Sequence, residues 1–211
     1  MATADSFPAP SHFSPKRGDP AWDLALMYPL QGAWTVDDYL RLDTGLLVEY
    51  TDGFIRVLPM PSLLHQWIVR FLFQVLHEYA TRRQVGEVFF APLPVQLTPS
   101  KYREPDLVLL RPHRIGAMRG HPVGADLVVE VVSDRPEDRR RDYDEKRDEY
   151  AAARIAEYWI VDSQHRKFTV LALEGDRYRE HGVYTAEGVA VSASLPDLTV
   201  TLSQLFAKCD G

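Results

Sequence analysis

Residues 126–132 read DLVVEVV, and this run decides how the rest of the chain is interpreted. It is almost continuously apolar, which is typical of a central strand covered on both faces of a sheet. Glu130 stands in the middle of the run with valines on either side. A buried carboxylate is protonated, paired with a cation or bound to a metal. The strand alone also allows a plain core pair with a basic residue, or a strand with one wet face.

The segments around this strand alternate between helical and strand-like patterns. Apolar residues at helical spacing predict a helix from Ser62 to about Arg83, and the charged run 136–153 predicts a second helix. Strand-like runs occupy 87–91, 94–97, 106–110, 157–162 and 167–173, with further strands at 177–184 and 188–194. Leu202, Leu205 and Phe206 predict a short closing helix. The pattern predicts an α/β chain, a mixed β-sheet with helices packed on it.

The N-terminal 33 residues differ in composition from the rest, because five of the 15 prolines fall there. We expect residues 1–33 to form an arm that hangs loose or wraps the surface. Residues 34–211 are predicted to form one domain. It opens with a short helix from Thr35 to about Leu42, followed by a hairpin that turns at Asp52-Gly53, a dipeptide that tolerates positive φ.

The composition excludes several classes of protein. A single cysteine, Cys209, excludes a disulfide framework and a cysteine-based zinc module, and fits a reducing cytosol. No apolar run approaches the ~20 residues of a membrane span, and the N-terminus lacks the pattern of a secretory signal, so we expect a soluble cytoplasmic protein. The net charge of −6 argues against broad coating of nucleic acid, but allows one local basic contact surface.

A second carboxylate heads another apolar run. Asp106 follows Pro105 in REPDLVLL, where it could be an ordinary residue at the end of a strand. Two carboxylates on neighbouring buried strands would repel each other unless a divalent cation lies between them. Oxygen ligands of this kind suit Mg²⁺ or Mn²⁺, so Asp106 and Glu130 are candidate metal ligands.

The charged helix contributes a candidate cation. Asp142, Lys146 and Tyr150 are spaced four residues apart and therefore share one helix face. Lys146 could form an ion pair with Asp142 on a solvated helix, or it could point at the two carboxylates and orient a water or a phosphate. As a solvent-facing residue it could be replaced by alanine with little loss of stability.

The ordered series EYTDGFIRVLPMPSLLHQ, REPDLVLL, DLVVEVVSD, RRRDYDEKRDEY and AEYWIVD resembles the Uma two (Uma2) family. This is a bacterial family of restriction-endonuclease-like proteins in the PD-(D/E)xK nuclease superfamily, and the resemblance covers the chain from about Thr35 to Phe206. It implies a restriction-endonuclease-like mixed sheet, with Asp106 and Glu130 as the acidic ligands. The usual lysine position of the superfamily is Val132 here, so the resemblance implies that Lys146 takes that role.

The resemblance also covers two earlier residues. It implies that His65, at the start of a helix, contacts a phosphate or a metal-bound water, and that Glu49 is an outer metal ligand. The plainer alternatives are a His65 bonded to a nearby loop and a Glu49 exposed on the hairpin. Arg139, Arg140 and Arg141 could contact flanking phosphates, or they could form a solvated helix face.

The predicted reaction is metal-assisted hydrolysis of a phosphodiester in DNA. Two alternatives remain open from the residues: an enzyme of the same fold that acts on RNA or a small phosphodiester, and a non-catalytic interaction protein. Intact Asp106, Glu130 and Lys146 count against the second alternative. We also expect a homodimer, with some of the large apolar residues on the dimer surface; the candidates are Trp67, Phe71, Phe73 and Trp159.

Overall fold

The central sheet places the predicted strands side by side. The computed structural model describes residues 28–43, 45–116, 118–133, 136–185 and 187–209. The six strands run in the order β10 (Arg177–Thr185), β9 (Lys167–Glu174), β8 (Glu157–Asp162), β7 (Leu127–Val131), β6 (Leu107–Leu110) and β3 (Glu87–Phe90). β7 and β8 are parallel and the other neighbours are antiparallel. The predicted mixed sheet is confirmed, and the DLVVEVV strand lies inside it with a neighbour on each side.

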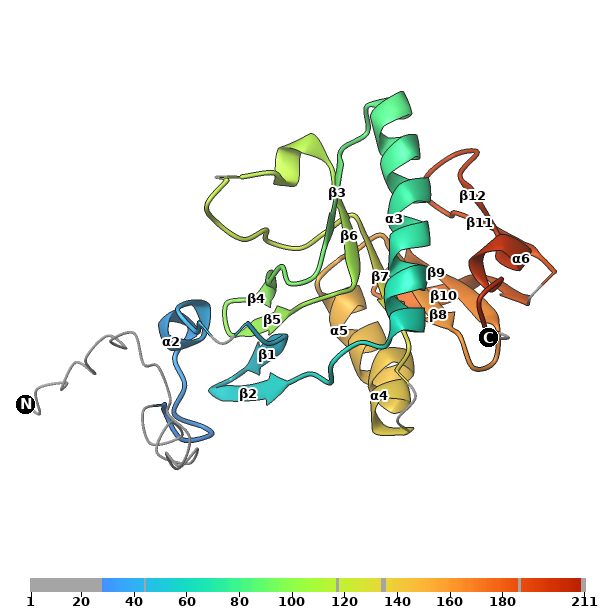
Figure 1. Cartoon of the computed structure of the whole chain (residues 1–211). Helices are drawn as coiled ribbons and strands as arrows, with labels where there is room; N and C mark the ends of the chain where they lie inside the picture. Colours follow the sequence, from blue (N-terminus) through green and yellow to red (C-terminus); the bar gives the residue numbers. More distant parts are fainter. Residues whose placement is uncertain (1–27, 44, 117, 134–135, 186, 210–211) are drawn as a thin grey trace, which may run out of the picture.

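Helices cover both faces of this sheet (Figure 1). Helix α3 (Leu63–Arg83) is capped by the Ser62 side chain, which accepts a hydrogen bond from the His65 N–H, so its predicted bounds are confirmed. Its buried residues pack against Val129 and Val131 of β7. Helix α5 (Lys146–Ala152) covers the opposite face, where Tyr150 packs in the same core as Val128. Since side chains alternate along a strand, Glu130 faces α5.

The predicted charged helix over 136–153 is not one regular α-helix. It consists of α4 (Pro136–Arg140), a π-helical turn η2 (Arg141–Glu145) and then α5. A π-turn inserts one residue into the helical repeat and changes which side chains point inward, and such turns often occur at functional sites. Here the turn lies immediately before Lys146.

A second, smaller sheet corrects the expectation of a single sheet. Its strands run in the order β2 (Phe54–Val57), β1 (Val48–Thr51), β5 (Lys101–Arg103) and β4 (Val95–Thr98). The hairpin prediction is confirmed, because Asp52 and Gly53 both have positive φ between β1 and β2. Gly53 is required there, since a Cβ would lie 2.8 Å from the Gly32 carbonyl oxygen. The sequence analysis missed β5, whose three residues carry no readable alternation.

The remaining elements contribute to the three hydrophobic core clusters. Helix α2 (Val36–Leu40), capped by Thr35, packs Tyr39 against the small sheet. A 3-10 turn η1 (Pro112–Arg114), strands β11 (Val189–Val191) and β12 (Thr199–Thr201), and helix α6 (Leu202–Leu205) follow, and α6 contributes Leu202 and Leu205 to the α3-side core. Trp159 is 1% exposed, which removes it from the four candidates for a dimer surface.

Two expectations concern the chain as a whole. Residues 1–27 of the predicted arm lie outside the described residues, while Gly32 and Trp34 donate backbone hydrogen bonds to the Gly53 carbonyl at the hairpin turn. None of the helices in the described ranges is long and apolar enough to cross a membrane.

Candidate active site

Strand register brings the two candidate acids together. β6 and β7 pair Leu107 with Val129, and one step further along the same antiparallel register Asp106 comes opposite Glu130. Opposed residues of an antiparallel pair point to the same face, with Cβ atoms about 5 Å apart. Asp106 Oδ2 accepts a hydrogen bond of 2.7 Å from the Val131 N–H, which fixes the carboxylate at the end of the strand pair.

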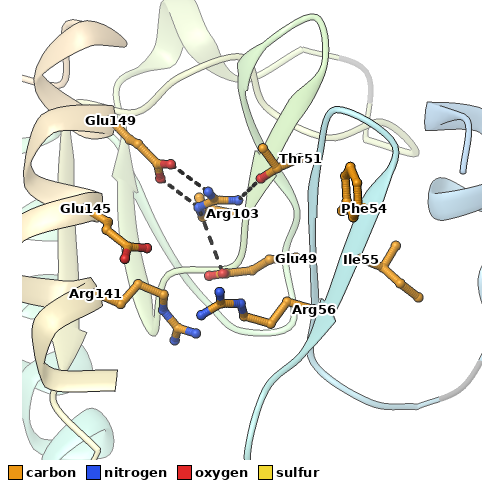
Figure 2. A pocket seen from close by; sticks show the side chains of 9 residues that line it. All are labelled: Glu49, Thr51, Phe54, Ile55, Arg56, Arg103, Arg141, Glu145 and Glu149. Atoms are coloured by element: carbon orange, nitrogen blue, oxygen red, sulfur yellow. Dashed lines mark hydrogen bonds and ion pairs between the residues drawn. The ribbon is translucent and has the colours of Figure 1, made fainter. Parts of the chain in front are cut away.

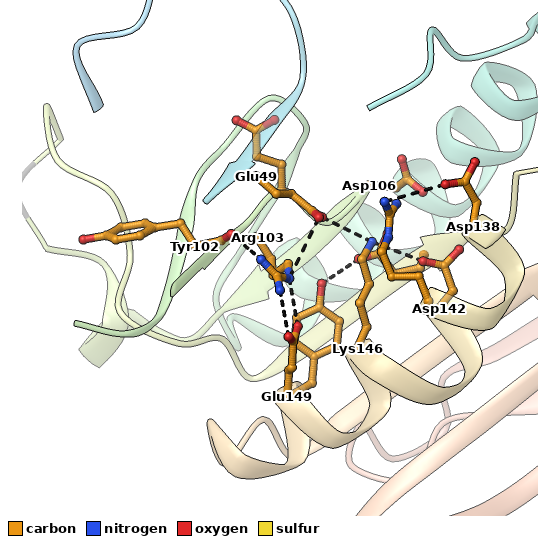
Figure 3. Close-up of polar contacts among 12 residues, drawn as sticks. Glu49, Tyr102, Arg103, Asp106, Asp138, Asp142, Lys146 and Glu149 are labelled. Carbon is orange, nitrogen blue, oxygen red and sulfur yellow. Dashed lines mark hydrogen bonds and ion pairs between the residues drawn. The ribbon is translucent and has the colours of Figure 1, made fainter. Parts of the chain in front are cut away.

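Lys146 points into this site and away from solvent (Figure 3). Its Nζ lies 2.8 Å from Glu130 Oε1, 3.2 Å from Asp142 Oδ1 and 3.5 Å from Glu49 Oε1. The two interpretations drawn from the sequence are therefore not alternatives: Lys146 pairs with Asp142 on its own helix and also reaches Glu130 on β7. Its helix face is not solvated, because Lys146 is 1% exposed.

His65 contacts the other acid. The Ser62 cap starts α3 at the edge of the sheet, and this places His65 Nε2 3.2 Å from Asp106 Oδ2. Burial alone would lower the pKa of His65, but the neighbouring Asp106 carboxylate raises it above its ordinary value. His65 Nδ1 is buried without a hydrogen-bond partner among the described residues. The partner of His65 is thus Asp106, in the segment that leads into β6, and the predicted contact with a phosphate or a metal-bound water stays a prediction.

Glu49 reaches the site from the small sheet. The residue is 3% exposed, so the alternative of an exposed hairpin residue is wrong. Its Oε2 lies 3.9 Å from Arg103 Nε on β5, and Arg103 in turn binds both carboxylate oxygens of Glu149. Arg103 and Glu149 could not be predicted from the sequence, because nothing in the linear order links β5 to α5.

Tyr150 and Asp142 complete the surroundings of Lys146. The Tyr150 hydroxyl donates a hydrogen bond of 2.6 Å to Glu130 Oε1, the same oxygen that Lys146 contacts. Tyr158 donates to the Asp142 backbone carbonyl and so fixes the π-turn against β8. The spacing of four between Asp142, Lys146 and Tyr150 was the available signal, and all three side chains do reach the site.

The site holds more carboxylates than it can easily keep ionised. Burial raises the pKa of Glu130 and of Asp142, although Lys146 opposes this shift in both. Burial alone would lower the pKa of Lys146, but Glu130, Asp142 and Glu49 raise it, so the ammonium stays charged. Excess buried negative charge favours either a shared proton or a further cation.

The oxygen donors fit a divalent cation of the magnesium type. Glu130 hydrogen-bonds through Oε1 and Asp106 through Oδ2, so Glu130 Oε2 and Asp106 Oδ1 have no hydrogen-bond partner among the described residues. Within those residues no group of three or more His, Cys, Asp or Glu side chains is arranged to hold a metal alone. Mg²⁺ is usually bound through one or two carboxylates, with water and substrate phosphate as its other ligands.

The three predicted phosphate-contacting arginines have three different surroundings. Arg139 pairs with Asp162 at the end of β8, and Arg140 is exposed. Arg141 is buried, lies 3.6 Å from Asp138, and lines a cleft of about 380 Å³ between the hairpin and the π-turn (Figure 2). The structure does not bring the three together into one basic surface.

Comparison with known proteins places this architecture among nuclease folds. A solved structure described as "a putative nuclease belonging to DUF820", from Anabaena variabilis ATCC 29413, matches with a TM-score of 0.68 and 18% sequence identity. The match covers 83% of this chain and 99% of that chain. Residues 36–203 match the model of the Uma2 family, described as "Putative restriction endonuclease", and the chain belongs to this family. No protein of curated function matches. Family and fold together support a nuclease function.

Proposed function

We propose that the chain is a divalent-metal-dependent endonuclease that hydrolyses phosphodiester bonds of DNA. The observation that carries this proposal is the placement of the Lys146 ammonium 2.8 Å from Glu130, on the strand next to Asp106, with one free oxygen left on each carboxylate. An acidic pair can hold a divalent ion that activates water, and an adjacent lysine can stabilise the charge that develops on the phosphate, so this arrangement suits metal-assisted phosphodiester hydrolysis.

Asp106 and Glu130 are the proposed ligands of Mg²⁺ or Mn²⁺. When bound, such an ion lowers the pKa of a coordinated water and neutralises charge on the scissile phosphate. His65 and the Val131 N–H hold one oxygen of Asp106, which leaves the other directed to the metal side. Glu49 acts as an outer residue that helps to position Lys146.

Lys146 is the proposed catalytic cation. Its three carboxylate neighbours keep it protonated, so it serves as a hydrogen-bond donor and point charge and does not act as a base. It orients the attacking water or stabilises the charge that develops on the phosphate. Tyr150 donates to the Glu130 oxygen that Lys146 contacts, and thereby fixes the distance between the helix and the strand.

DNA is the proposed substrate. The proposed assembly is a homodimer, because enzymes that cut both strands of a duplex often pair two active sites. Cleavage assays with Mg²⁺ or Mn²⁺ on duplex DNA, single-stranded DNA and RNA test the substrate. Cutting of RNA alone would replace DNA with the alternative substrate, and no cutting of any of them would favour the interaction protein. A monomeric mass at micromolar concentration would exclude the dimer.

The metal site is tested with Asp106→Asn. Without metal this variant should melt near the wild-type temperature, because the amide oxygen can still accept from the Val131 N–H. Mn²⁺ at 100 times its dissociation constant should stabilise the wild type by about 2.7 kcal/mol, and should leave the variant unshifted and inactive.

Asp126→Asn is the matched control, since Asp126 lies just before the opposite end of β7, beside Arg114. The control should keep the full Mn²⁺ shift and the cleavage activity. If Asp106→Asn also keeps the full shift, Asp106 is a structural residue and the proposed metal site is wrong.

A further inference from the structure

The cleft beside the carboxylates contains an arginine, Arg141, whose charge is balanced by nearby carboxylates, Glu49 first, but whose hydrogen-bond donors are not satisfied within the described residues. Arg141 is 7% exposed, and its guanidinium makes one ion pair of 3.6 Å with Asp138 and no hydrogen bond to any described residue. Its Nε is fully buried and has no hydrogen-bond acceptor in the part of the chain that the structure describes. A guanidinium has five N–H donors, and burying them unsatisfied is costly. The burial is therefore best explained by an acceptor that binds in the cleft.

A second arginine faces it from the other wall. β1 and β2 pair Glu49 with Arg56, so both side chains project from the same face of the hairpin. Arg56 and Arg141 line the same cleft, and Figure 2 shows their guanidinium groups pointing toward one another. Arg56 is exposed and has no ion pair or side-chain hydrogen bond within the described ranges. Two facing guanidinium groups repel unless an anion lies between them.

The other charged residues of the cleft are largely accounted for. Arg103 is bound by Glu149 and also donates to the Thr51 hydroxyl. Glu49 lies against Lys146 and Arg103. Glu145 is exposed at the rim, and it is the one acidic lining residue without a described partner. Among the lining residues, Arg56 therefore has no ion pair within the described ranges, Arg141 has a charge partner in Asp138 but no hydrogen bond, and Glu145 is the exposed acid at the rim.

The cleft also adjoins the proposed active site. Glu49 lines the cleft and, through Oε1, lies 3.5 Å from Lys146 Nζ. Arg141 belongs to the π-turn that ends directly before Lys146. A nucleic-acid strand that binds with its scissile phosphate at Asp106 and Glu130 would place the adjoining phosphate near this cleft. Facing arginines form bidentate hydrogen bonds with phosphate oxygens, which makes phosphate the anion that this geometry favours.

The geometry points to a second phosphate subsite in this cleft, in which Arg141 and Arg56 clamp the phosphodiester that adjoins the scissile one. The inference rests on the proposed function, because it takes the ligand to be a nucleic-acid strand. Arg56 and Arg141 act in binding and positioning, and neither touches the bond that is broken.

The test measures binding without cleavage. A fluorescein-labelled ten-nucleotide oligothymidylate is titrated with the full-length protein in EDTA, and fluorescence anisotropy gives the dissociation constant at several salt concentrations. Arg56→Gln and Arg141→Gln should each weaken binding about tenfold, as expected for one charge-assisted hydrogen-bonding partner. The double variant should lose less than the product of the two losses, because both arginines hold one phosphate. In the double variant, log affinity should depend less steeply on log salt concentration. The magnitude of the slope should decrease by about 0.7, the value for one phosphate contact on a single strand.

Two further variants separate a local subsite from general charge. Arg82→Gln removes the same charge from the exposed far end of α3, and should change affinity less than twofold. Glu145→Gln removes the opposing charge at the rim and should tighten binding about threefold. Arg56 is exposed, so its variant should fold even if Arg141→Gln does not, and melting curves verify this.

Wild-type affinity in Arg56→Gln, or an equal loss in Arg56→Gln and Arg82→Gln, would overturn the subsite. The proposed nuclease activity is tested separately, because cleavage is measured in the wild type with Mn²⁺ and binding is measured in EDTA. Intact cleavage together with an unaffected Arg56→Gln removes the subsite alone. Lost binding in Arg56→Gln supports the subsite even if the wild type cuts nothing.

Discussion

Two buried glutamates on adjacent parallel strands, Glu157 and Glu130, have different partners and therefore different roles. Glu157 begins β8 and is 0% exposed, while Glu130 lies near the end of β7 and is 4% exposed. Glu157 accepts hydrogen bonds from Trp159 Nε1, the Ser192 hydroxyl and the backbone N–H groups of residues 193 and 194. These are neutral donors that saturate both of its oxygens.

Glu130 has ionisable partners and keeps one oxygen unused. Its Oε1 contacts the Lys146 ammonium and the Tyr150 hydroxyl, and Oε2 has no partner among the described residues. A carboxylate saturated by neutral donors fixes a loop in place, whereas one with a spare oxygen can bind a ligand. The difference between Glu157 and Glu130 therefore lies in their partners, since both are buried.

The largest expected effect separates the two glutamates by activity. Glu130→Gln should reduce Mn²⁺-dependent cleavage about 1,000-fold or more, equivalent to about 4 kcal/mol in the barrier, because it removes a charged ligand. Glu157→Gln should keep near wild-type turnover per folded molecule at a temperature below its melting point. Equal losses of activity in the two variants would contradict the different roles of Glu130 and Glu157.

The second prediction concerns the cation beside Glu130. Lys146→Met should lower the free energy of unfolding by about 3 kcal/mol in denaturant titrations, because it leaves buried carboxylates without their counter-charge. This corrects the expectation of an almost unchanged stability, which assumed a solvent-facing lysine; Lys146 is 1% exposed. Adding Glu130→Gln to Lys146→Met should recover part of the loss, and strictly additive losses would show that the pair is not coupled.

The third prediction tests the structural glutamate by stability. Glu157→Gln places an amide NH₂ among donors, so at least one N–H that now bonds to Glu157 loses its acceptor. The expected loss is about 2 kcal/mol, which lowers the melting temperature by roughly 4–8 °C in a chain of this size. Ser203→Ala, an exposed residue of α6, is a control that should leave the midpoint unchanged. A similarly unchanged midpoint in Glu157→Gln would mean that the loop at residues 192–195 needs no such anchor.

Part of the fold and of the candidate site could be predicted from the sequence. Glu130 stood out because it interrupts a valine run, and the spacing of Asp142, Lys146 and Tyr150 identified one helix face. Helix α3, the hairpin and the central strands followed from local periodicity and turn chemistry, which are properties of neighbouring residues.

The remainder depends on contacts between distant segments. Arg103 and Arg56 come from the small sheet, whose strand β5 is three residues long and is defined only by its partners. The π-turn cannot be predicted from RDYDE alone; in the fold, the Asp142 carbonyl of the turn accepts a hydrogen bond from Tyr158 of β8, 16 residues further along the chain. Glu157 could not be told from Glu130 by pattern, because most of its donors belong to residues 192–194, which lie 35 to 37 residues further along the chain.

A third buried glutamate gives the smallest expected effect. Glu104, on the link between β5 and β6, is 7% exposed and accepts one backbone hydrogen bond of 2.9 Å, from the Val48 N–H. Burial raises its pKa from 4.5 to about 7, the Val48 N–H partly opposes this shift, and Glu49 adds to it. With one donor it is neither saturated like Glu157 nor paired with a cation like Glu130.

The sign of its effect on stability follows from linkage. Between pH 4.5 and pH 7 the folded state retains a proton on Glu104 that the unfolded chain has released. The contribution of protonated Glu104 to the free energy of unfolding is therefore fully present below pH 4.5 and is lost as the pH rises through about 7. Glu104→Gln keeps the acceptor for Val48 and removes the titration, so it should stabilise the protein at pH 8 and leave it almost unchanged at pH 4.5. Denaturant titrations of both proteins across this range measure the difference. A constant difference between them would show that Glu104 titrates normally and that burial alone does not set the behaviour of these glutamates.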